Sequence, residues 1–389
     1  MRRARRIEKV PPYLFAEIDR KRREAVARGV DVISLGIGDP DLPTPDFIVD
    51  RLVHEARDPA THHYPPYEGT VVFRQAVATY YGRRFGVDLD PDREVMALIG
   101  SKEGLAHLIW AFVDPGDAVL VPDPGYPVYG THALLAGGAV VPLPLRPELD
   151  FLADFEAVTA EDRHRAKMMF LCYPNNPTAG TADIGFFRRA VDFARDSDTL
   201  LVNDSAYVEV TFDNYEAPSV LQIPGAKDVA VEFGSLSKPF NMTGWRLGYA
   251  VGNPEAISAL GIIKTNTDSG QFEAIQRAGA VALTSPAARE AIRRMRGIYQ
   301  RRRDVVVETL TRLGCPVRRP RGSFYVWAPV PAGYTSAAFA AHVLEAAGVI
   351  ITPGSAYGAR GEGYFRVSLT VPDARLDEAF RRLAACVTW

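Results

Sequence analysis

A lysine and an arginine eight positions apart have residue types suited to chemistry on an anionic ligand that carries an aldehyde. Lys238 follows the small and polar residues Gly234-Ser235-Leu236-Ser237, and Arg246 follows Thr243-Gly244-Trp245. Burial and a neighbouring cation both lower the pKa of a lysine, so its neutral amine can attack an aldehyde. The arginine supplies a permanently charged partner for a phosphate. A surface lysine beside a salt-bridged arginine is the plain alternative, and the apolar, glycine-rich setting disfavours it.

A carboxylate and a tyrosine follow the apolar run that ends at Val202. Asp204 stands at the end of this expected strand, and Tyr207 comes three residues later. A buried carboxylate is costly unless a cation pairs with it. A protonated pyridine nitrogen is such a cation, and it makes the ring an electron sink. Tyr207 is then within reach of a hydroxyl on the same ring.

Three more turns follow apolar runs. Gly100-Ser101-Lys102 opens a helix, where backbone N–H groups and the helix dipole favour an anion, although an ordinary tight turn fits equally well. Tyr126 is held between prolines and could stack on a planar ring, or simply pack within its loop. Asn176 lies in a stiff proline-flanked turn, for which an Asx-turn is the plain interpretation.

Arg366 stands inside the apolar run Phe365–Leu369. A buried arginine needs an anionic partner. A structural aspartate or glutamate is the ordinary partner, and a substrate carboxylate is the functional one.

Alternating strands and helices must position these residues. Six apolar runs, four to eight residues long and rich in Val, Ile and Leu, predict buried strands: Glu94–Ile99, Ala118–Val121, Lys167–Cys172, Thr199–Val202, Val229–Phe233 and Arg246–Val251. Helical stretches between them, such as Leu105–Phe112, indicate an α/β fold with a mostly parallel sheet. Ligands bind beyond the carboxyl ends of such strands, where the polar residues above lie.

The C-terminal region predicts a second, smaller α+β domain. A long charged helix, Pro286–Leu313, leads to expected strands at Ser323–Val330 and Tyr364–Leu369 and to helices at Ser336–Ala347 and Arg375–Ala385. The amphipathic helix expected at Tyr13–Ala27 is assigned to the same domain. The predicted division is a large domain of residues 40–285 and a small domain of residues 1–39 and 286–389.

Composition excludes several classes of function. The 389 residues carry a net charge of −2, which offers no basic surface for nucleic acid. Three distant cysteines and seven histidines form neither a disulfide framework nor a zinc motif, so no metal is expected. No run of about 18 apolar residues and no secretory signal pattern occurs, which favours a cytoplasmic protein without a membrane span. The arginine clusters Arg2–Arg6 and Arg301–Arg303 are predicted to lie on solvated helix faces.

Taken together, these motifs resemble the fold-type I enzymes that use pyridoxal 5′-phosphate (PLP), specifically the aspartate aminotransferase superfamily (classes I and II). The match runs nearly end to end with the motifs in the same order. Within the superfamily the chain is most similar to LL-diaminopimelate aminotransferases, through these stretches: VPPYLFAEID (10–19), SLGIGDPDLPTP (34–45), YPPYEG (64–69), DPGYPVY (123–129), YPNNPT (173–178), SLSKPFNMTGWR (235–246) and DSGQFEAIQ (268–276).

The resemblance implies a role for each matching residue. Lys238 would form the Schiff base and move the proton, Asp204 would pair with the pyridine nitrogen, and Tyr126 would stack on the ring. Tyr207 and Asn176 would bind the ring oxygen. The phosphate would be held by Ser101, Lys102, Ser235, Ser237 and Arg246, and by Tyr64 reaching from the partner subunit of a homodimer with shared active sites. The substrate would meet Arg366 through its α-carboxylate, with Gly38, Tyr13 and Asn176 nearby.

The implied reaction moves an amino group from an α-amino acid, best matched by LL-diaminopimelate in lysine biosynthesis, to 2-oxoglutarate. Within PLP enzymes, the alternatives are another amino-acid aminotransferase (aspartate, alanine or aromatic type) and an elimination or cyclisation enzyme. Outside them, a serine acyl-transfer enzyme would fit the SxxK pattern at Ser235–Lys238 but lacks its SDN and KTG elements. A nicotinamide oxidoreductase would need a GxGxxG motif, which is absent. A non-catalytic binding module is disfavoured by the intact lysine and arginine.

Overall fold

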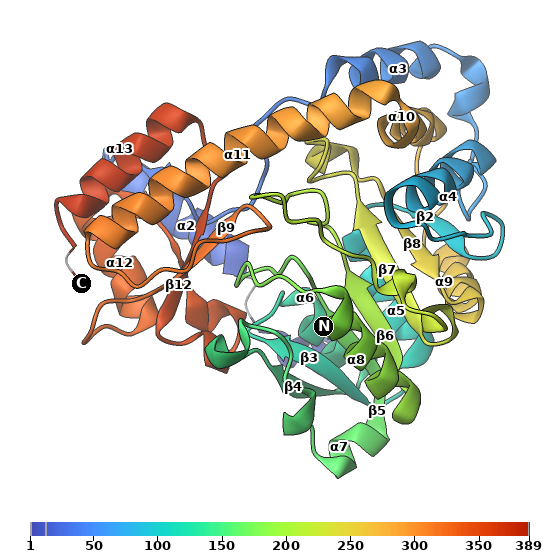
Figure 1. The fold of residues 1–389 in the computed structure, drawn as a ribbon, viewed down its shortest axis with the longest axis horizontal. Coiled ribbons are helices and arrows are strands. Elements are labelled where there is room, and N and C mark those ends of the chain that lie inside the picture. Colours follow the sequence, from blue (N-terminus) through green and yellow to red (C-terminus); the bar gives the residue numbers. More distant parts are fainter. Residues whose placement is uncertain (1, 12–13, 388) are drawn as a thin grey trace.

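The computed structural model describes residues 2–11, 14–387 and 389, and a seven-stranded sheet forms its centre (Figure 1). The strand order is β2-β8-β7-β6-β5-β3-β4. The strands are β2 (Val95–Leu98), β3 (Ala118–Asp123), β4 (Ala139–Pro144), β5 (Ala166–Leu171), β6 (Leu200–Asp204), β7 (Ala230–Ser235) and β8 (Gly248–Gly252). Only β8 is antiparallel to its two neighbours; the other pairs are parallel. The predicted mostly parallel sheet is therefore confirmed.

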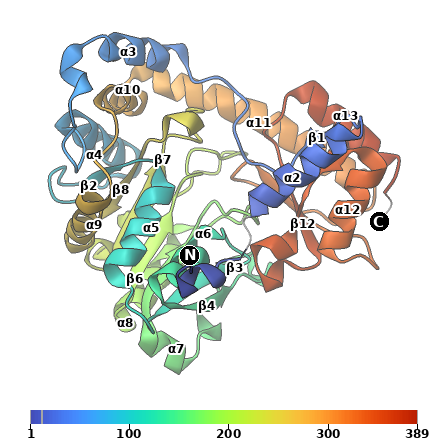
Figure 2. The same cartoon turned by 180° about the vertical axis from the view of Figure 1, so that it is seen from behind.

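Helices cover both faces of this sheet, as the two opposite views show (Figures 1 and 2). Successive strand residues point to opposite faces. Val202 accordingly belongs to the same buried cluster as Leu105 of α5, while Leu201 belongs to the cluster that contains Phe187 of α8. Both faces are apolar, which explains the nearly continuous hydrophobic strands. The helices of this part are α3 (Asp46–Ala56), α4 (Val71–Phe85), α5 (Ser101–Phe112), α6 (Val128–Ala136), α7 (Ala160–Arg165), α8 (Ile184–Asp196), α9 (Pro254–Thr267) and α10 (Glu273–Thr284).

A smaller group of elements surrounds a three-stranded antiparallel sheet of order β11-β12-β9. Its strands are β9 (Tyr325–Pro329), β11 (Thr352–Pro353) and β12 (Tyr364–Ser368), and its helices are α12 (Ser336–Ala347) and α13 (Asp373–Ala384). Near the N-terminus, α1 (Arg5–Glu8) and α2 (Leu14–Ala27) precede β1 (Ile33–Ser34), which pairs with β10 (Val349–Ile350). Both views place α2 beside α12 and α13 (Figures 1 and 2).

The long helix α11 (Pro286–Arg312) runs from the large sheet's helices to the smaller sheet (Figure 1). The prediction of a solvated cluster at 301–303 holds for Arg301, which is exposed, but is wrong for Arg302 and Arg303. Arg303 is fully buried and paired with Asp213, and Arg302 is buried against both carboxylate oxygens of Asp41 at 2.7 and 2.9 Å. Arg303 also pairs with its sequence neighbour Asp304, but Asp41 and Asp213 are distant in sequence, and the local pattern does not reveal them.

All six predicted strands of the large sheet are present within a few residues, and so are the helices at 286–312 and 336–347. The prediction missed the seventh strand, β4. Its burial alternates until Leu143 and it contains two prolines, as an edge strand permits. It therefore lacks the continuous apolar character of the central strands.

Candidate active site

A cavity of about 340 Å³ lies at the carboxyl ends of the parallel strands and gathers most of the predicted site residues. Turns after β3, β5, β6 and β7 each contribute to it, as expected for a ligand crevice in this type of sheet. The lining residues are Ile37, Gly38, Ser101, Lys102, Tyr126, Tyr129, Cys172, Asn176, Asp204, Ala206, Tyr207, Ser235, Ser237, Lys238, Arg246 and Tyr325.

Lys238 projects into this cavity from the turn after β7, and its Nζ donates to the Gly38 carbonyl at 3.1 Å. Burial lowers the pKa of the amine to about 8. Asp39 opposes this shift, while the positive charges of Arg246 and Arg366 reinforce it. A substantial fraction of the amine is consequently neutral near pH 8, as a nucleophile requires.

Asp204 is the buried carboxylate at the end of β6. The Tyr129 hydroxyl donates to its Oδ2 at 2.8 Å, and the Ala206 N–H lies 3.4 Å from its Oδ1. Burial nevertheless raises the pKa of Asp204 to about 6, because the two hydrogen bonds and the more distant Lys238 only partly offset the loss of water. A cation bound beside Asp204 would remove this penalty.

The N-terminus of α5 and Arg246 form two sides of an anion-binding cup. Gly100 precedes the helix with φ +73°, and a Cβ there would lie 2.3 Å from Nη2 of Arg246. Only glycine therefore lets the guanidinium lie against the turn. Ser101 and Lys102 are the first helical residues, so their backbone N–H groups point outward from the N-terminus of the helix. A phosphate is the natural ligand for this combination.

Arg366, fully buried on β12, closes the other end of the site. Its guanidinium donates to Oδ1 of Asn176 at 2.8 Å and to the Gly36 carbonyl at 2.6 Å, and it lies 4.0 Å from the centre of the Tyr325 ring. Within the part of the chain that the structure describes, its Nε has no hydrogen-bond partner. Its hydrogen-bond partners among the described residues, Asn176 and Gly36, are neutral, so the positive charge remains available to an anion.

Tyr207 and Tyr325 connect these two ends of the cavity. Their hydroxyls lie 3.1 Å apart, and both side chains are buried. Tyr325 also explains why position 38 is a glycine, because a Cβ there would lie 1.9 Å from the tyrosine hydroxyl. The segment containing Gly38 thus packs directly over the site.

Eleven predicted residues line the cavity together: Gly38, Ser101, Lys102, Tyr126, Asn176, Asp204, Tyr207, Ser235, Ser237, Lys238 and Arg246. Arg366 adjoins it through Asn176. Tyr64 does not line it and is 85% exposed. Tyr13 lies outside the described residues.

Sequence reasoning missed Tyr129 and Tyr325. Tyr129 lies in the first turn of α6, three residues after Tyr126, so it stands in the same strand-end segment that drew attention to Tyr126. Tyr325 stands in an apolar strand and carries no local sign of its role.

The comparisons with known proteins agree with this geometry. Residues 30–383 match the family model for aminotransferase class I and II. The chain belongs to this aminotransferase family. It is 57% identical over 383 residues to an LL-diaminopimelate aminotransferase of Moorella thermoacetica, covering 98% of each chain.

Solved structures show the same fold for this aminotransferase. A substrate-bound BacF from Bacillus subtilis superimposes with a TM-score of 0.95 at 35% identity, covering 99% of this chain and 98% of that one. An aspartate aminotransferase variant from Thermus thermophilus gives 0.92 at 30% identity over the whole of both chains. The protein is therefore an enzyme that transfers amino groups between amino acids and oxo acids, on an α/β fold of type I.

Proposed function

We propose that this aminotransferase binds PLP in the cavity beside Lys238 and transfers the amino group of LL-diaminopimelate to 2-oxoglutarate. The observation that supports the cofactor best is the arrangement of opposite charges along the cavity. A buried carboxylate, Asp204, stands at one side, and an anion cup with Arg246 stands at another. Lys238 lies in the same cavity with its lowered pKa.

The chemistry of the donor set fits PLP group by group. The buried carboxylate of Asp204, whose pKa burial raises, matches a protonated ring nitrogen, and Tyr126 offers a flat face to the ring. The cup beside Gly100 matches the phosphate. Asn176 and Tyr207 are polar groups suited to the ring oxygen. When bound, PLP would supply the electron sink that stabilises negative charge at the substrate Cα.

The chain's own residues supply positioning and proton transfer. Lys238 would hold the cofactor aldehyde in the resting enzyme and then carry a proton from the substrate Cα as its amine becomes free. Asp204 would keep the ring nitrogen protonated. Arg366 would bind the substrate α-carboxylate with its planar fork, exchanging its carbonyl contact with Gly36 for a charged partner.

A homodimer with shared active sites completes the proposal. Tyr64 is 85% exposed, and Tyr67, Val71 and Val72 beside it are also exposed. Apolar side chains gathered on one stretch of surface favour burial against a second chain. In that arrangement Tyr64 would reach the phosphate of the partner subunit.

We also retain two finer assignments as proposals, the division into domains and a cytoplasmic location. The large domain would comprise residues 40–285 and the small domain residues 1–39 and 286–389. The three cysteines are free, which agrees with a reducing cytoplasm. No helix in the described part of the chain is long and apolar enough to cross a membrane.

The substrate assignment rests on relatives rather than on contacts to a bound ligand. Identity to the Moorella thermoacetica LL-diaminopimelate aminotransferase is 57%, against 30% to the aspartate aminotransferase variant. A site that binds a distal ammonium and carboxylate would reject simpler side chains, because its polar groups would lose their partners.

A donor screen tests this assignment. Amino donors are supplied with 2-oxoglutarate and glutamate is measured. We expect strong activity with LL-diaminopimelate and little with aspartate, alanine or aromatic amino acids. Good activity on another donor alone would overturn the substrate but not the cofactor. Spectral changes with amino acids but no glutamate from any donor would favour elimination or cyclisation.

Replacing Lys238 tests the cofactor and the chemistry together. Lys238→Ala should abolish glutamate formation and the visible absorbance of lysine-bound PLP, because it removes the amine that would hold the cofactor aldehyde. Lys167→Ala, which removes an exposed lysine on β5, is the matched control and should keep both. Normal turnover by Lys238→Ala would contradict the central proposal.

A further inference from the structure

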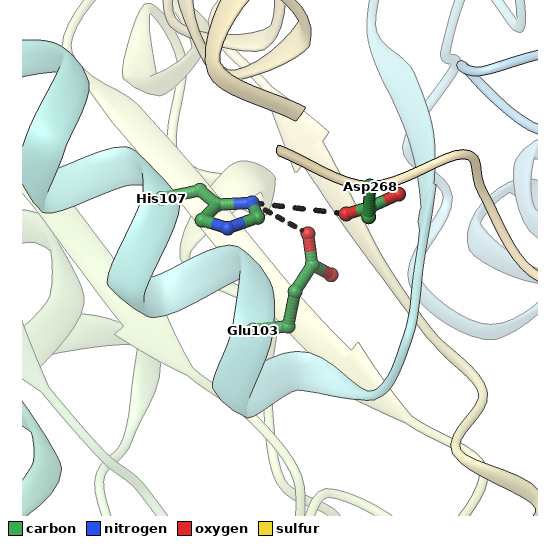
Figure 3. Close-up of side chains that lie close together, drawn as sticks. All are labelled: Glu103, His107 and Asp268. Carbon is green, nitrogen blue, oxygen red and sulfur yellow. Dashed lines mark ion pairs between the residues drawn. The ribbon is translucent and has the colours of Figure 1, made fainter. Parts of the chain in front are cut away.

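A buried ionic cluster lies next to the phosphate-binding turn, behind the cavity. Glu103 and His107 on α5 and Asp268 at the end of α9 point toward one another (Figure 3). Nδ1 of His107 lies 2.7 Å from Glu103 and 4.0 Å from Asp268. Lys264 joins them, with Nζ 2.9 Å from Asp268 and 3.4 Å from Glu103. None of the four is among the residues that line the cavity.

The cluster acts as an ion-pair network rather than as a metal site. The ligand atoms of Glu103, His107 and Asp268 lie within 4.8 Å of one another, a spacing that suits a metal ion. However, the buried Lys264 ammonium already bridges the two carboxylates. Burial acts to raise the pKa of Asp268, but hydrogen bonds from Lys264 and from the Gly270 N–H hold it below its ordinary value. A second cation would be repelled by the ammonium.

One arm of the network reaches the turn that opens α5. Oε2 of Glu103 accepts a hydrogen bond from the Ile99 N–H at 3.0 Å. Ile99 directly precedes Gly100, whose positive φ sets the direction of the chain into the helix. The carboxylate that contacts Lys264 therefore also fixes the backbone that presents the N–H groups of Ser101 and Lys102.

A second arm reaches Arg246 on the opposite side of the cup. Oδ1 of Asp268 accepts from the Gly270 N–H at 2.7 Å. The next residue, Gln271, donates from Nε2 to the carbonyls of Trp245 and Arg246, both at 2.6 Å. Arg246 has φ +53°, a left-handed conformation that a residue with a side chain adopts only when its surroundings impose it.

These connections join the two sides of the anion cup through one buried cluster. We propose that Lys264, Asp268 and Gln271 are positioning residues that hold the Gly100–Lys102 turn and Arg246 at the separation the PLP phosphate requires. This inference rests on the proposed PLP function. It assigns a role to the DSGQ segment that concerns the cofactor's phosphate and not its ring.

The ring and the phosphate are held by different parts of the chain, which makes the proposal testable. Asp204 and Tyr126 face the ring and belong to β6 and the turn after β3. Asp204 accepts hydrogen bonds from the Tyr129 hydroxyl and the Ala206 N–H, on elements other than those of Lys264 and Asp268. Damage to the cluster should therefore weaken binding of PLP but leave binding of pyridoxal, which lacks the phosphate, unchanged.

The experiment compares the dissociation constants of PLP and pyridoxal for cofactor-free enzyme, measured by equilibrium dialysis. Asp268→Asn keeps the shape and the acceptor for Gly270 but removes the charge that pairs with Lys264. Gln271→Ala, at a partly exposed residue, removes the two bonds that hold Arg246. We expect each to raise the dissociation constant of PLP by about tenfold or more and that of pyridoxal by less than about twofold.

Asp213→Asn is the matched control, because Asp213 pairs with the buried Arg303 away from the cup. It should lower thermal stability without changing the ratio of the two constants. Unchanged PLP binding in both cluster variants, or an equal loss of PLP and pyridoxal binding, would overturn the positioning role. If wild-type enzyme itself showed no preference for PLP over pyridoxal, the proposed function would fail instead.

Discussion

In the absence of cofactor, the buried charge of Asp204 should destabilise the fold. Burial raises its pKa from 3.8 to about 6, and the Tyr129 hydroxyl compensates only in part. Each unit of pKa difference between the folded and unfolded states is worth about 1.4 kcal/mol. The difference of about two units therefore lowers the free energy of unfolding by about 3 kcal/mol. Because the folded pKa is the higher one, the cost is complete above about pH 6 and disappears below pH 3.8, where both states are protonated.

Asp204→Asn removes this charge while keeping an oxygen that can accept from Tyr129. We expect the cofactor-free variant to exceed wild type in unfolding free energy by up to about 3 kcal/mol at pH 8. The difference should shrink as the pH falls through 6. Urea denaturation at one protein concentration and several pH values measures it, with the exposed Asp196→Asn on α8 as control.

With PLP bound, wild type should become more stable than Asp204→Asn, because a protonated ring nitrogen pairs with the aspartate but not with asparagine. The variant should then lose activity by about 100-fold or more. A cofactor-free variant no more stable than wild type at pH 8 would refute the claim that this carboxylate is uncompensated. Wild-type activity in the variant would refute its pairing with the ring nitrogen.

Three further predictions follow from the same site. Arg366→Lys should raise KM for all amino-acid donors together, because lysine keeps the charge but loses the bidentate fork; loss confined to one donor would show that Arg366 reads the side chain. The rate at which PLP reacts with cofactor-free enzyme should rise with pH around a midpoint near 8, the pKa of Lys238. Asp39→Asn should move this midpoint lower, since the Asp39 charge raises that pKa, and an unchanged midpoint would contradict the electrostatic account. Tyr64→Ala mixed with Lys238→Ala should regain activity in hybrid dimers that carry one intact site, as measured by glutamate formation; full activity of Tyr64→Ala alone would exclude its role across the interface.

The sequence alone determined the sheet and the residues that meet at its edge. Buried parallel strands are apolar on both faces, so six of the seven strands could be located from the local pattern of residues. The carboxyl ends of parallel strands lie at one edge of the sheet, so the polar residues that follow those strands are expected to lie near one another. Lys238, Asp204 and Arg246 were therefore predictable together. β4 was not, because an edge strand with prolines lacks that pattern.

Only the tertiary structure decided which partners these residues have. Tyr129 reaches Asp204 across 75 positions, and Asn176 accepts from Arg366 across 190. The buried arginines of α11 likewise find Asp41 and Asp213 on distant loops, so their own neighbours predicted a solvated face. Spacing along the chain carries information about one helix face or one strand end. Contacts between such elements depend on how whole layers pack, and that packing sets the charge balance of the site.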